Sequence, residues 1–223
     1  MLALENAKTR LVHTDDSLVQ LLDPPFNTSS ENPGYIMGYP PGVRENGGQY
    51  THAAVWLAQA YARLGRGKDA VRILQMLNPA ERTSTAERLA QYRGEPYAVA
   101  ADVSFTPGRV GIAGWTWYTG SAGWMYRVWL EDVLGFRLEG SRLRMAPNVP
   151  DDWPGFELTY RHGSSAYRIV VVRDSAGNAV TMQCDGKMCM ENYVDLIDDG
   201  APHRVDIDIS AEKLVPVTDS RAN

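Results

Sequence analysis

The sequence has no excess of basic residues and no long apolar run. Its 22 Lys and Arg residues stand against 27 Asp and Glu residues, a formal net charge of −5. A nucleic-acid surface needs clustered positive charge, so the composition argues against nucleic acid as a partner. No stretch approaches the roughly 18 apolar residues of a membrane helix, and residues 1–10 lack the apolar core of a signal peptide. We therefore expect no membrane span in this chain and a cytoplasmic location.

Disulfide and metal-binding patterns are also missing from the sequence. The two cysteines, Cys184 and Cys189, flank Asp185-Gly186, a dipeptide typical of a two-residue hairpin turn. In that register they lie diagonally across the hairpin, about 7–8 Å apart, which is too far for an unstrained disulfide. Free thiols fit a reducing, cytoplasmic setting. The four histidines show no metal-ligand spacing, so we expect no metal site.

The period of the apolar residues changes near residue 136, from helical spacing to alternation. A length of 223 residues suits one large domain or two small ones. Turn and capping signals predict Gly65 as the residue that ends the second helix and residues 92–111 as an irregular loop. The helices expected from the apolar spacing are Thr9–Leu22, Ala53–Leu64, Asp69–Leu77, Glu81–Gln91 and Ser121–Leu134.

After residue 136, short alternating runs are separated by turn signals, a rhythm typical of a β-sandwich. The expected strands are Leu143–Met145, Phe156–Tyr160, Tyr167–Arg173, Ala179–Cys184, Lys187–Val194 and Arg204–Ile209, with a turn at Ser175–Gly177. Residues 210–223 have no apolar period and read as a tail. The predicted domains are therefore residues 1–135, residues 136–209 and a tail of residues 210–223.

The segment from Gly34 to His52 has the composition of an active-site loop. Glycines and prolines shape it, and Tyr35, Tyr39 and Tyr50 supply flat faces for a sugar or a base. Arg44, Glu45 and His52 supply charge and proton-transfer groups just before an amphipathic helix. The alternative is an ordered connector whose aromatic rings simply pack.

A second candidate segment, Gly114 to Trp124, leads into the last predicted helix. Thr119, Gly120 and Ser121 place hydroxyls and unpaired backbone N–H groups at that helix's N-terminus, where the macrodipole favours an anion such as phosphate. The alternative is a Thr or Ser cap beside core tryptophans. The neighbouring rings fit either a sugar-stacking wall or the core: Trp115, Trp117 and Tyr118.

Several longer motifs resemble the C-terminal end of the cyclic β-1,2-glucan synthases. The similarity runs from about Thr9 to Ile209 and is carried by Pro24-Pro25-Phe26, residues 33–54, Glu95–Val103, Gly114–Arg127, Pro150–Phe156 and Asp198–His203. Those enzymes belong to the inverting glycoside phosphorylases, glycoside hydrolase family 94, with the cellobiose and chitobiose phosphorylases. The resemblance implies an α+β fold, in which the last helices of an (α/α)6 barrel precede a C-terminal antiparallel β-sandwich.

The resemblance also implies roles for individual residues. His52, Thr119 and Gly120 match positions that hold phosphate, and Tyr39, Arg44 and Glu45 match positions that line the sugar subsites. It implies no bound cofactor, with inorganic phosphate as co-substrate and a β-linked gluco-oligosaccharide or glucan as the sugar partner. In inverting phosphorolysis phosphate attacks the anomeric carbon while a carboxylic acid protonates the departing oxygen.

The sequence departs from the family at that acid. The family's general acid is an aspartate in a Trp-Asn-Asp-Gly type motif, which this sequence does not contain. We therefore assign no catalytic residue and expect no activity from the chain alone, which would need the missing N-terminal part of the same enzyme or a second copy as a partner.

A different class of function is an adaptor that binds carbohydrate without catalysis. Trp56 to Gly65, with Ala70 and Pro79, is similar to one tetratricopeptide unit, and the strand region fits a carbohydrate-binding module. Against it, no 34-residue repeat is found elsewhere in the chain.

Overall fold

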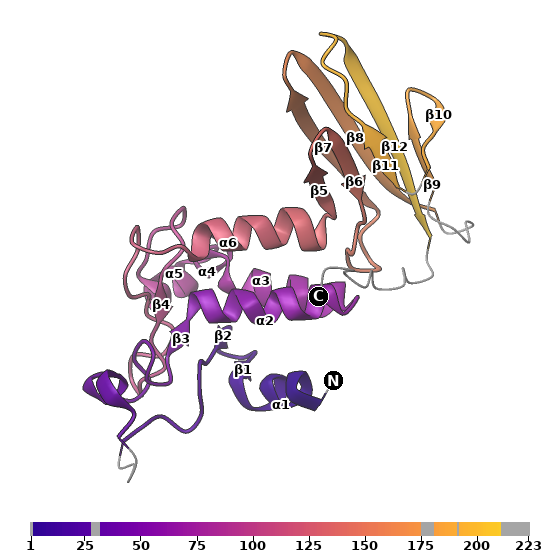
Figure 1. Cartoon of the computed structure of the whole chain (residues 1–223). Helices are drawn as coiled ribbons and strands as arrows, with labels where there is room; N and C mark the ends of the chain where they lie inside the picture. Colours follow the sequence, from indigo (N-terminus) through magenta and orange to yellow (C-terminus); the bar gives the residue numbers. More distant parts are fainter. Residues whose placement is uncertain (1, 28–31, 175–180, 191, 211–223) are drawn as a thin grey trace. The chain divides into compact units, whose positions relative to one another are not determined.

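The computed structural model describes residues 2–27, 32–174, 181–190 and 192–210. It divides into two compact units (Figure 1), which we call the helical unit, Met1–Tyr61 with Asp69–Val128, and the strand unit, Ala62–Lys68 with Trp129–Asn223. Among the described residues, no helix is both long and apolar enough to cross a bilayer. The fold is thus of mixed α+β type, while the barrel, the sandwich and the domain limits stay predictions.

The helical unit begins with a helix that is shorter and earlier than expected. Helix α1 spans Leu2–Leu11, and β1 (Val12–His13) then pairs antiparallel with β2 (Leu18–Val19), so the predicted helix Thr9–Leu22 is wrong. A turn intervenes in which the Ser17 N–H donates to the Thr14 carbonyl and Ser17 has φ +50°. The Asp-Asp-Ser sequence of this turn outweighed the helical spacing of the flanking leucines and valines.

The next two helices agree with the sequence in extent. Helix α2 spans Thr51–Arg63, α3 spans Gly67–Leu77, and Gly65 between them has φ +73°. The apolar spacing predicts a buried stripe of Ala70, Ile73, Leu74 and Leu77 in α3, and all four are buried. The stripe expected for α2 is only partly buried: Tyr61 is buried, whereas Trp56 and Leu64 are exposed. The other buried apolar residues of α2 are Ala54, Val55, Ala58 and Ala62.

Caps divide the segment that was expected to be one helix over Glu81–Gln91. Helix α4 (Pro79–Arg82) starts after Asn78, whose side chain accepts from the Ala80 N–H, and α5 (Ala86–Tyr92) starts after Thr85. The Thr85 hydroxyl accepts from the Arg88 N–H at 3.3 Å. Ser and Thr side chains that bond the backbone locally favour such restarts.

The predicted loop over residues 92–111 contains a strand. Strand β4 (Asp102–Val103) pairs antiparallel with β3 (Gln49–Tyr50), and Val103 also forms a bridge with Ala113. Beneath this small sheet, a buried cluster gathers residues from distant segments: Leu18, Tyr92, Ala100 and Val103. Part of the predicted loop, residues 100–103, is therefore packed in the unit's interior, while Tyr97 and residues 107–109 are exposed.

The last predicted helix is present. Helix α6 spans Ser121–Arg127 and continues as a π-helical segment, η2, over Val128–Val133. Gly135, at φ +76°, follows it and leads into the strands.

The described residues of the strand unit form two sheets. The five-stranded sheet has the order β10-β9-β12-β8-β7, and the three-stranded sheet has the order β11-β6-β5. Phe136 of β5 meets Tyr160 of β7 edge to face at 5.2 Å, which brings the two sheets into contact. The strands are β5 Phe136–Glu139, β6 Arg142–Met145, β7 Gly155–His162, β8 Ser165–Asp174, β9 Thr181–Cys184, β10 Lys187–Met188, β11 Tyr193–Asp195 and β12 Pro202–Ser210.

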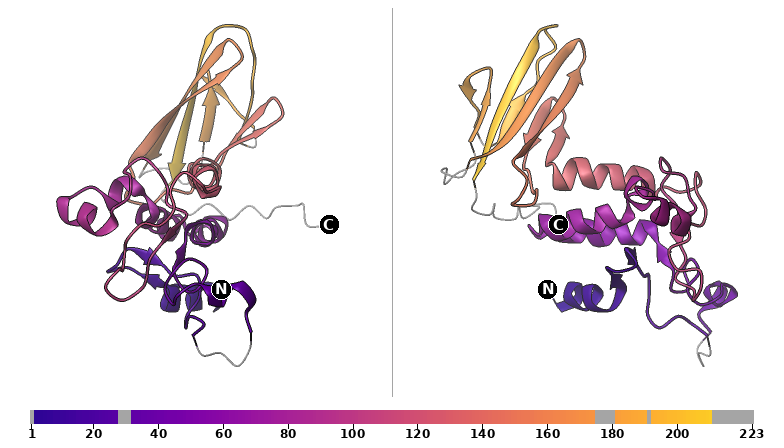
Figure 2. Two further views of the ribbon diagram at one scale, coloured as in Figure 1. Left: turned by 90° about the vertical axis from the view of Figure 1, so that its left-hand side faces the viewer. Right: turned by 180° about the vertical axis from the view of Figure 1, so that it is seen from behind.

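Three details of the strand prediction need correction. The sheet is not wholly antiparallel, because β12 and β8 run parallel over their whole length (yellow and orange in Figure 2). Strand β5 was not expected, and the run Lys187–Val194 forms two strands of different sheets rather than one. The predicted turn at Ser175–Gly177, the start of the strand Ala179–Cys184 and the tail beyond residue 210 lie outside the described residues.

The hairpin around Asp185-Gly186 is confirmed in its predicted register. Cys184 lies opposite Lys187, and both cysteines are free. Burial raises the pKa of the Cys184 thiol to about 11. The thiol is therefore protonated at neutral pH and is a poor nucleophile.

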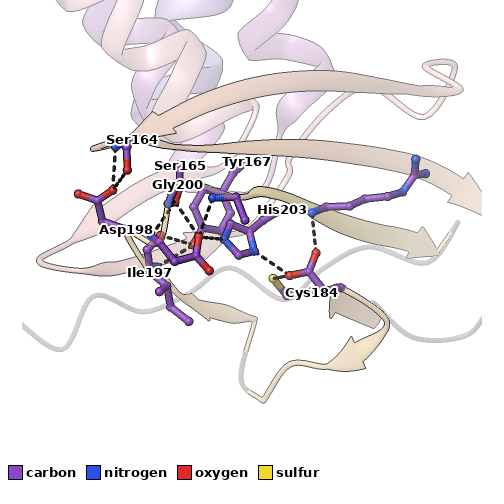
Figure 3. A network of polar contacts seen from close by, with 12 residues as sticks. Ser164, Ser165, Tyr167, Cys184, Ile197, Asp198, Gly200 and His203 are labelled. Atoms are coloured by element: carbon purple, nitrogen blue, oxygen red, sulfur yellow. Dashed lines mark hydrogen bonds and ion pairs between the residues drawn. The ribbon is translucent and has the colours of Figure 1, made fainter.

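A network of polar contacts ties this hairpin to the loop before β12 (Figure 3). The two ring nitrogens of His203 lie 2.8 Å from Asp185 Oδ2 and 3.1 Å from Asp199 Oδ1, and the ring stacks on Tyr167 at 4.6 Å. The Ser165 hydroxyl accepts from the N–H groups of Asp199 and Gly200. With carboxylates on both sides, the imidazolium form of His203 can donate two hydrogen bonds at once.

The network predicts a pH-dependent stability of the strand unit. Hydrogen bonds with Asp185 and Asp199 raise the pKa of His203, so its contribution is complete below the ordinary histidine value of about 6.5 and is lost as the pH rises through the raised value. Hydrogen bonds from the Arg204 N–H to Asp185 and from the Ala201 N–H to Asp199, followed by the contacts with His203, lower the pKa of both carboxyls, so their contribution is lost only in acid. We expect His203→Gln to lower the free energy of unfolding in urea more at pH 5.5 than at pH 8.5.

The matched control is a double-mutant cycle with Asp185→Asn, measured at both pH values. Because the two side chains share one interaction, their effects should be less than additive at pH 5.5 and closer to additive at pH 8.5. An equal loss in His203→Gln at both pH values would contradict the assignment.

Candidate functional site

The loop before α2 is held by one buried asparagine. A single turn of 3₁₀ helix, η1 (Gly34–Gly38), is followed by Tyr39 and by glycines with positive φ at Gly42 and Gly47. The fully buried Asn46 donates to the carbonyls of Tyr39 (2.7 Å) and Phe26 (2.9 Å) and accepts from the Phe26 N–H. This side chain fixes the loop's course, and sequence reasoning did not single it out.

Arg44 lies between two aromatic rings and two carboxylates. Its Cζ is 4.8 Å from the centre of the Trp115 ring and 5.6 Å from that of Tyr39. Its Nε is 3.9 Å from Glu45 Oε2 and 4.0 Å from Asp102 Oδ1. Arg44 has φ +47°, an unusual value for a residue with a side chain, and such strained conformations gather at binding sites.

His52 lies in the first turn of α2 and faces two tryptophans. Its ring centre is 5.0 Å from that of Trp56 on the same helix and 5.7 Å from that of Trp124 on α6. His52 Nε2 is buried and has no hydrogen-bond partner among the described residues, and the same holds for Trp124 Nε1, Arg44 Nε and Glu45 Oε2. Buried polar atoms are rarely left unpaired, and leaving one so costs about 1–3 kcal/mol.

Thr119 and Gly120 lie at the start of α6. The Thr119 hydroxyl is 2.6 Å from the Ser121 hydroxyl and accepts from the Ser121 N–H. The N-cap of α6 is Gly120, and no side chain caps the helix, so the alternative of a Thr or Ser N-cap is wrong. Gly120 is exposed, and nothing lies within 4 Å of where its Cβ would be. The Gly120 carbonyl accepts from the Trp124 N–H, which places the ring that meets His52 one helical turn away. A phosphate at Thr119 and Gly120 stays a prediction.

The aromatic residues around Trp117 form an exposed surface. Trp115 is 55% exposed, Trp117 73% and Tyr118 77%, so the interpretation of these rings as core is wrong. Tyr97 adds a fourth exposed ring, 5.9 Å from that of Trp117. Glu95 Oε1 accepts from the Trp117 indole N–H at 3.2 Å and so orients that ring.

Comparison with known proteins identifies the family. Residues 1–135 match the model of the glycosyl hydrolase 94 superfamily, catalytic domain. The chain belongs to this family. The match covers the loop, both tryptophan-bearing helices and the exposed aromatic surface, and it includes the α2–α3 pair that is similar to a tetratricopeptide unit. The tetratricopeptide-like pair is therefore part of the family domain, while a carbohydrate-binding role of the strand region stays a prediction.

Several relatives of known type are similar over most of this chain. The cyclic β-(1,2)-glucan synthase NdvB of Rhizobium meliloti is 46% identical over 78% of the chain, which is 6% of the synthase. The N,N'-diacetylchitobiose phosphorylase of Vibrio proteolyticus is 34% identical over 66% of the chain and 18% of that enzyme. The solabiose phosphorylase of Paenibacillus borealis is 28% identical over 84% of the chain and 24% of that enzyme. The chain thus spans a quarter or less of the length of these three relatives.

One further residue of the family domain, Asp102, belongs to the site and was not assigned to it from the sequence. It is 6% exposed, and burial raises the pKa of its carboxyl, while Arg44 opposes part of that shift. A single carboxylate within the apolar run from Ala98 to Val103 was the available signal. Its partner Arg44 is 58 positions away, a pairing that sequence spacing does not reveal.

The structure brings the predicted residues together in two groups. Tyr39, Glu45 and Trp115 all contact Arg44. His52 meets α6 through Trp124, and the direct approach of His52 to Thr119 stays a prediction. The two groups are joined by β3, which lies between Glu45 and His52 in the chain.

The role of Asn46 can be tested by unfolding. We expect Asn46→Ala to lower the free energy of unfolding by at least about 2 kcal/mol, because the Phe26 N–H and two carbonyls lose their partner in a buried place. Asn6→Ala, on the exposed side of α1, is the control and should change stability by no more than about 0.5 kcal/mol. Equal losses in urea unfolding would show that Asn46 does not hold the loop.

Proposed function

We propose that this chain supplies sugar- and phosphate-binding residues to a family 94 enzyme that acts on a β-linked gluco-oligosaccharide or glucan. The observation that carries the proposal is a set of buried polar atoms with no hydrogen-bond partner among the described residues: Arg44 Nε, Glu45 Oε2 and His52 Nε2, all within one nine-residue segment. A ligand that bonds them would offset the cost of leaving them unpaired.

Arg44 and Glu45 suit the hydroxyl groups of a sugar. Their unpaired atoms are one donor and one acceptor, 3.9 Å apart. A hydroxyl group placed against this pair can accept from the arginine and donate to the glutamate. Tyr39 and the exposed rings of Trp115, Trp117 and Tyr118 supply faces on which sugar rings stack. This composition is that of a carbohydrate site.

His52, Thr119 and Gly120 are the proposed phosphate contacts. Inorganic phosphate would be a co-substrate, and the proposal includes no bound cofactor. His52 can hold and neutralise an anion through its unpaired Nε2, and the start of α6 offers backbone N–H groups. The support is the pairing of His52 with α6 at Trp124, together with the names of the phosphorylases to which the chain is similar.

Cleavage requires a group that we do not find in this sequence. Protonation of the glycosidic oxygen needs a carboxylic acid placed between sugar and phosphate, and no Trp-Asn-Asp-Gly type motif is present. We therefore propose that the chain binds but does not cleave by itself, and that the remaining part of such an enzyme, or a second copy, completes the site. The free thiols fit a reducing compartment, and we propose a cytoplasmic location.

The first test is of activity. Residues 1–223 incubated with β-1,2-gluco-oligosaccharides and inorganic phosphate should release no glucose 1-phosphate, because no positioned acid is present. The measurement is an enzymatic assay for glucose 1-phosphate, with His52→Ala run in parallel. Release by the wild-type chain that disappears in His52→Ala would show that an acid in this chain performs the reaction.

The second test is of phosphate binding. Titration followed by ³¹P NMR should show phosphate binding to residues 1–223, and His52→Ala should weaken it about tenfold, equivalent to about 1.4 kcal/mol. His13→Ala is the matched control, because His13 lies in the same unit and contacts Gln20 and Phe105 instead. The same affinity in wild type and His52→Ala would remove His52 from the phosphate site.

A further inference from the structure

Asp102 occupies a place that the backbone keeps open for a carboxylate. It lies on β4 opposite Tyr50, and its Oδ1 accepts from the Trp115 N–H at 3.4 Å. A Cβ on Gly114 would lie 2.3 Å from Asp102 Oδ2, so any larger residue at position 114 would displace the carboxylate. The absence of a side chain at 114 is what admits Asp102 to this place.

The environment of Asp102 disfavours the ionised form of its carboxyl. The side chain is buried, and the neighbouring Glu45 carboxylate adds repulsion, so the pKa of Asp102 is raised by burial first and by Glu45 to a lesser degree. The hydrogen bond from the Trp115 N–H needs only an oxygen acceptor. The space beside Gly114 needs only a planar group of this size. An asparagine provides both, so neither explains a charged residue.

The one contact that needs the charge is that with Arg44. Arg44 Nε is 4.0 Å from Asp102 Oδ1, and the guanidinium also faces the Trp115 ring, whose backbone N–H bonds the same carboxylate. Asp102 therefore contacts both the arginine and the residue on which it stacks. The charged and titratable groups that face Asp102 are Arg44 and Glu45.

We propose that Asp102 is a positioning residue, whose carboxylate holds the Arg44 guanidinium over the Trp115 ring in the orientation that receives a sugar hydroxyl. The role in sugar binding rests on the proposed function, whereas the hold on Arg44 does not. Asp102 acts through Arg44 and does not itself touch the sugar. The ionised form keeps the arginine in place, and protonation of Asp102 releases it.

The experiment follows the Arg44 Nε–H resonance by ¹H–¹⁵N NMR in residues 1–223. In the wild-type chain its chemical shift should titrate with a midpoint above the ordinary aspartate value of about 3.9. Asp102→Asn keeps the shape and removes the charge, so it should abolish this titration and shift the signal toward that of an exposed arginine. Glu45→Gln, the matched control, should keep the titration. A titration that persists in Asp102→Asn would overturn the proposal.

Sugar binding is measured separately on the same samples, with β-1,2-gluco-oligosaccharide as the probe. We expect Asp102→Asn to weaken binding about tenfold at pH 7 and Gly114→Ala to do the same by displacing the carboxylate. Wild-type binding that is unchanged in both variants would overturn the positioning role. If the wild-type chain binds no oligosaccharide, the sugar part of the proposed function fails, and the Arg44 titration still decides whether Asp102 holds Arg44.

Discussion

The site of the helical unit depends on backbone pairing among β3, β4 and residues 113–115. Tyr50 lies opposite Asp102 in the β3–β4 ladder, and Asp102 in turn accepts from the Gly114 N–H. Two flanking hydrogen bonds continue the pairing on both sides: the Thr51 N–H donates to the Ala101 carbonyl, and the Ala101 N–H donates to the Trp115 carbonyl. These bonds hold the end of the Gly34–His52 loop next to the segment that begins at Gly114. Arg44, in that loop, can therefore stack on Trp115.

The polar side chains around His203 and those around Arg44 and His52 differ in how fully they are hydrogen-bonded. Around His203 the side chains of serine, aspartate and tyrosine bond one another and the backbone. Around Arg44 and His52, four buried side-chain atoms have no hydrogen-bond partner among the described residues: Arg44 Nε, Glu45 Oε2, His52 Nε2 and Trp124 Nε1. Strain and unpaired groups reduce stability and persist where a ligand uses them. This contrast supports the binding site proposed for the helical unit of this family 94 chain.

Local chemistry explains both the successes and the errors of the secondary-structure prediction. Gly65 correctly predicted the end of α2, and the apolar spacing of Ile73 and Leu74 correctly predicted the buried stripe of α3. Asp185-Gly186 correctly predicted its hairpin. The helix expected over Thr9–Leu22 failed because a four-residue turn interrupts it. The parallel pairing of β12 with β8 could not be foreseen, because alternation reports which face is buried and not which neighbour a strand chooses.

The sequence by itself determined the kinds of groups in the site and the family to which they belong. The glycines, the aromatic residues and the charged residues of the segment from Gly34 to His52 are close together in the sequence, so a sequence motif is enough to identify them. Only the tertiary structure decided which of these groups meet: that Arg44 faces Asp102, that His52 faces Trp124, and that Trp115 and Tyr118 are exposed. The physical reason is that these contacts join side chains tens of residues apart in the chain, and that strand pairing and burial, which sequence spacing does not encode, decide both the contacts and the exposure.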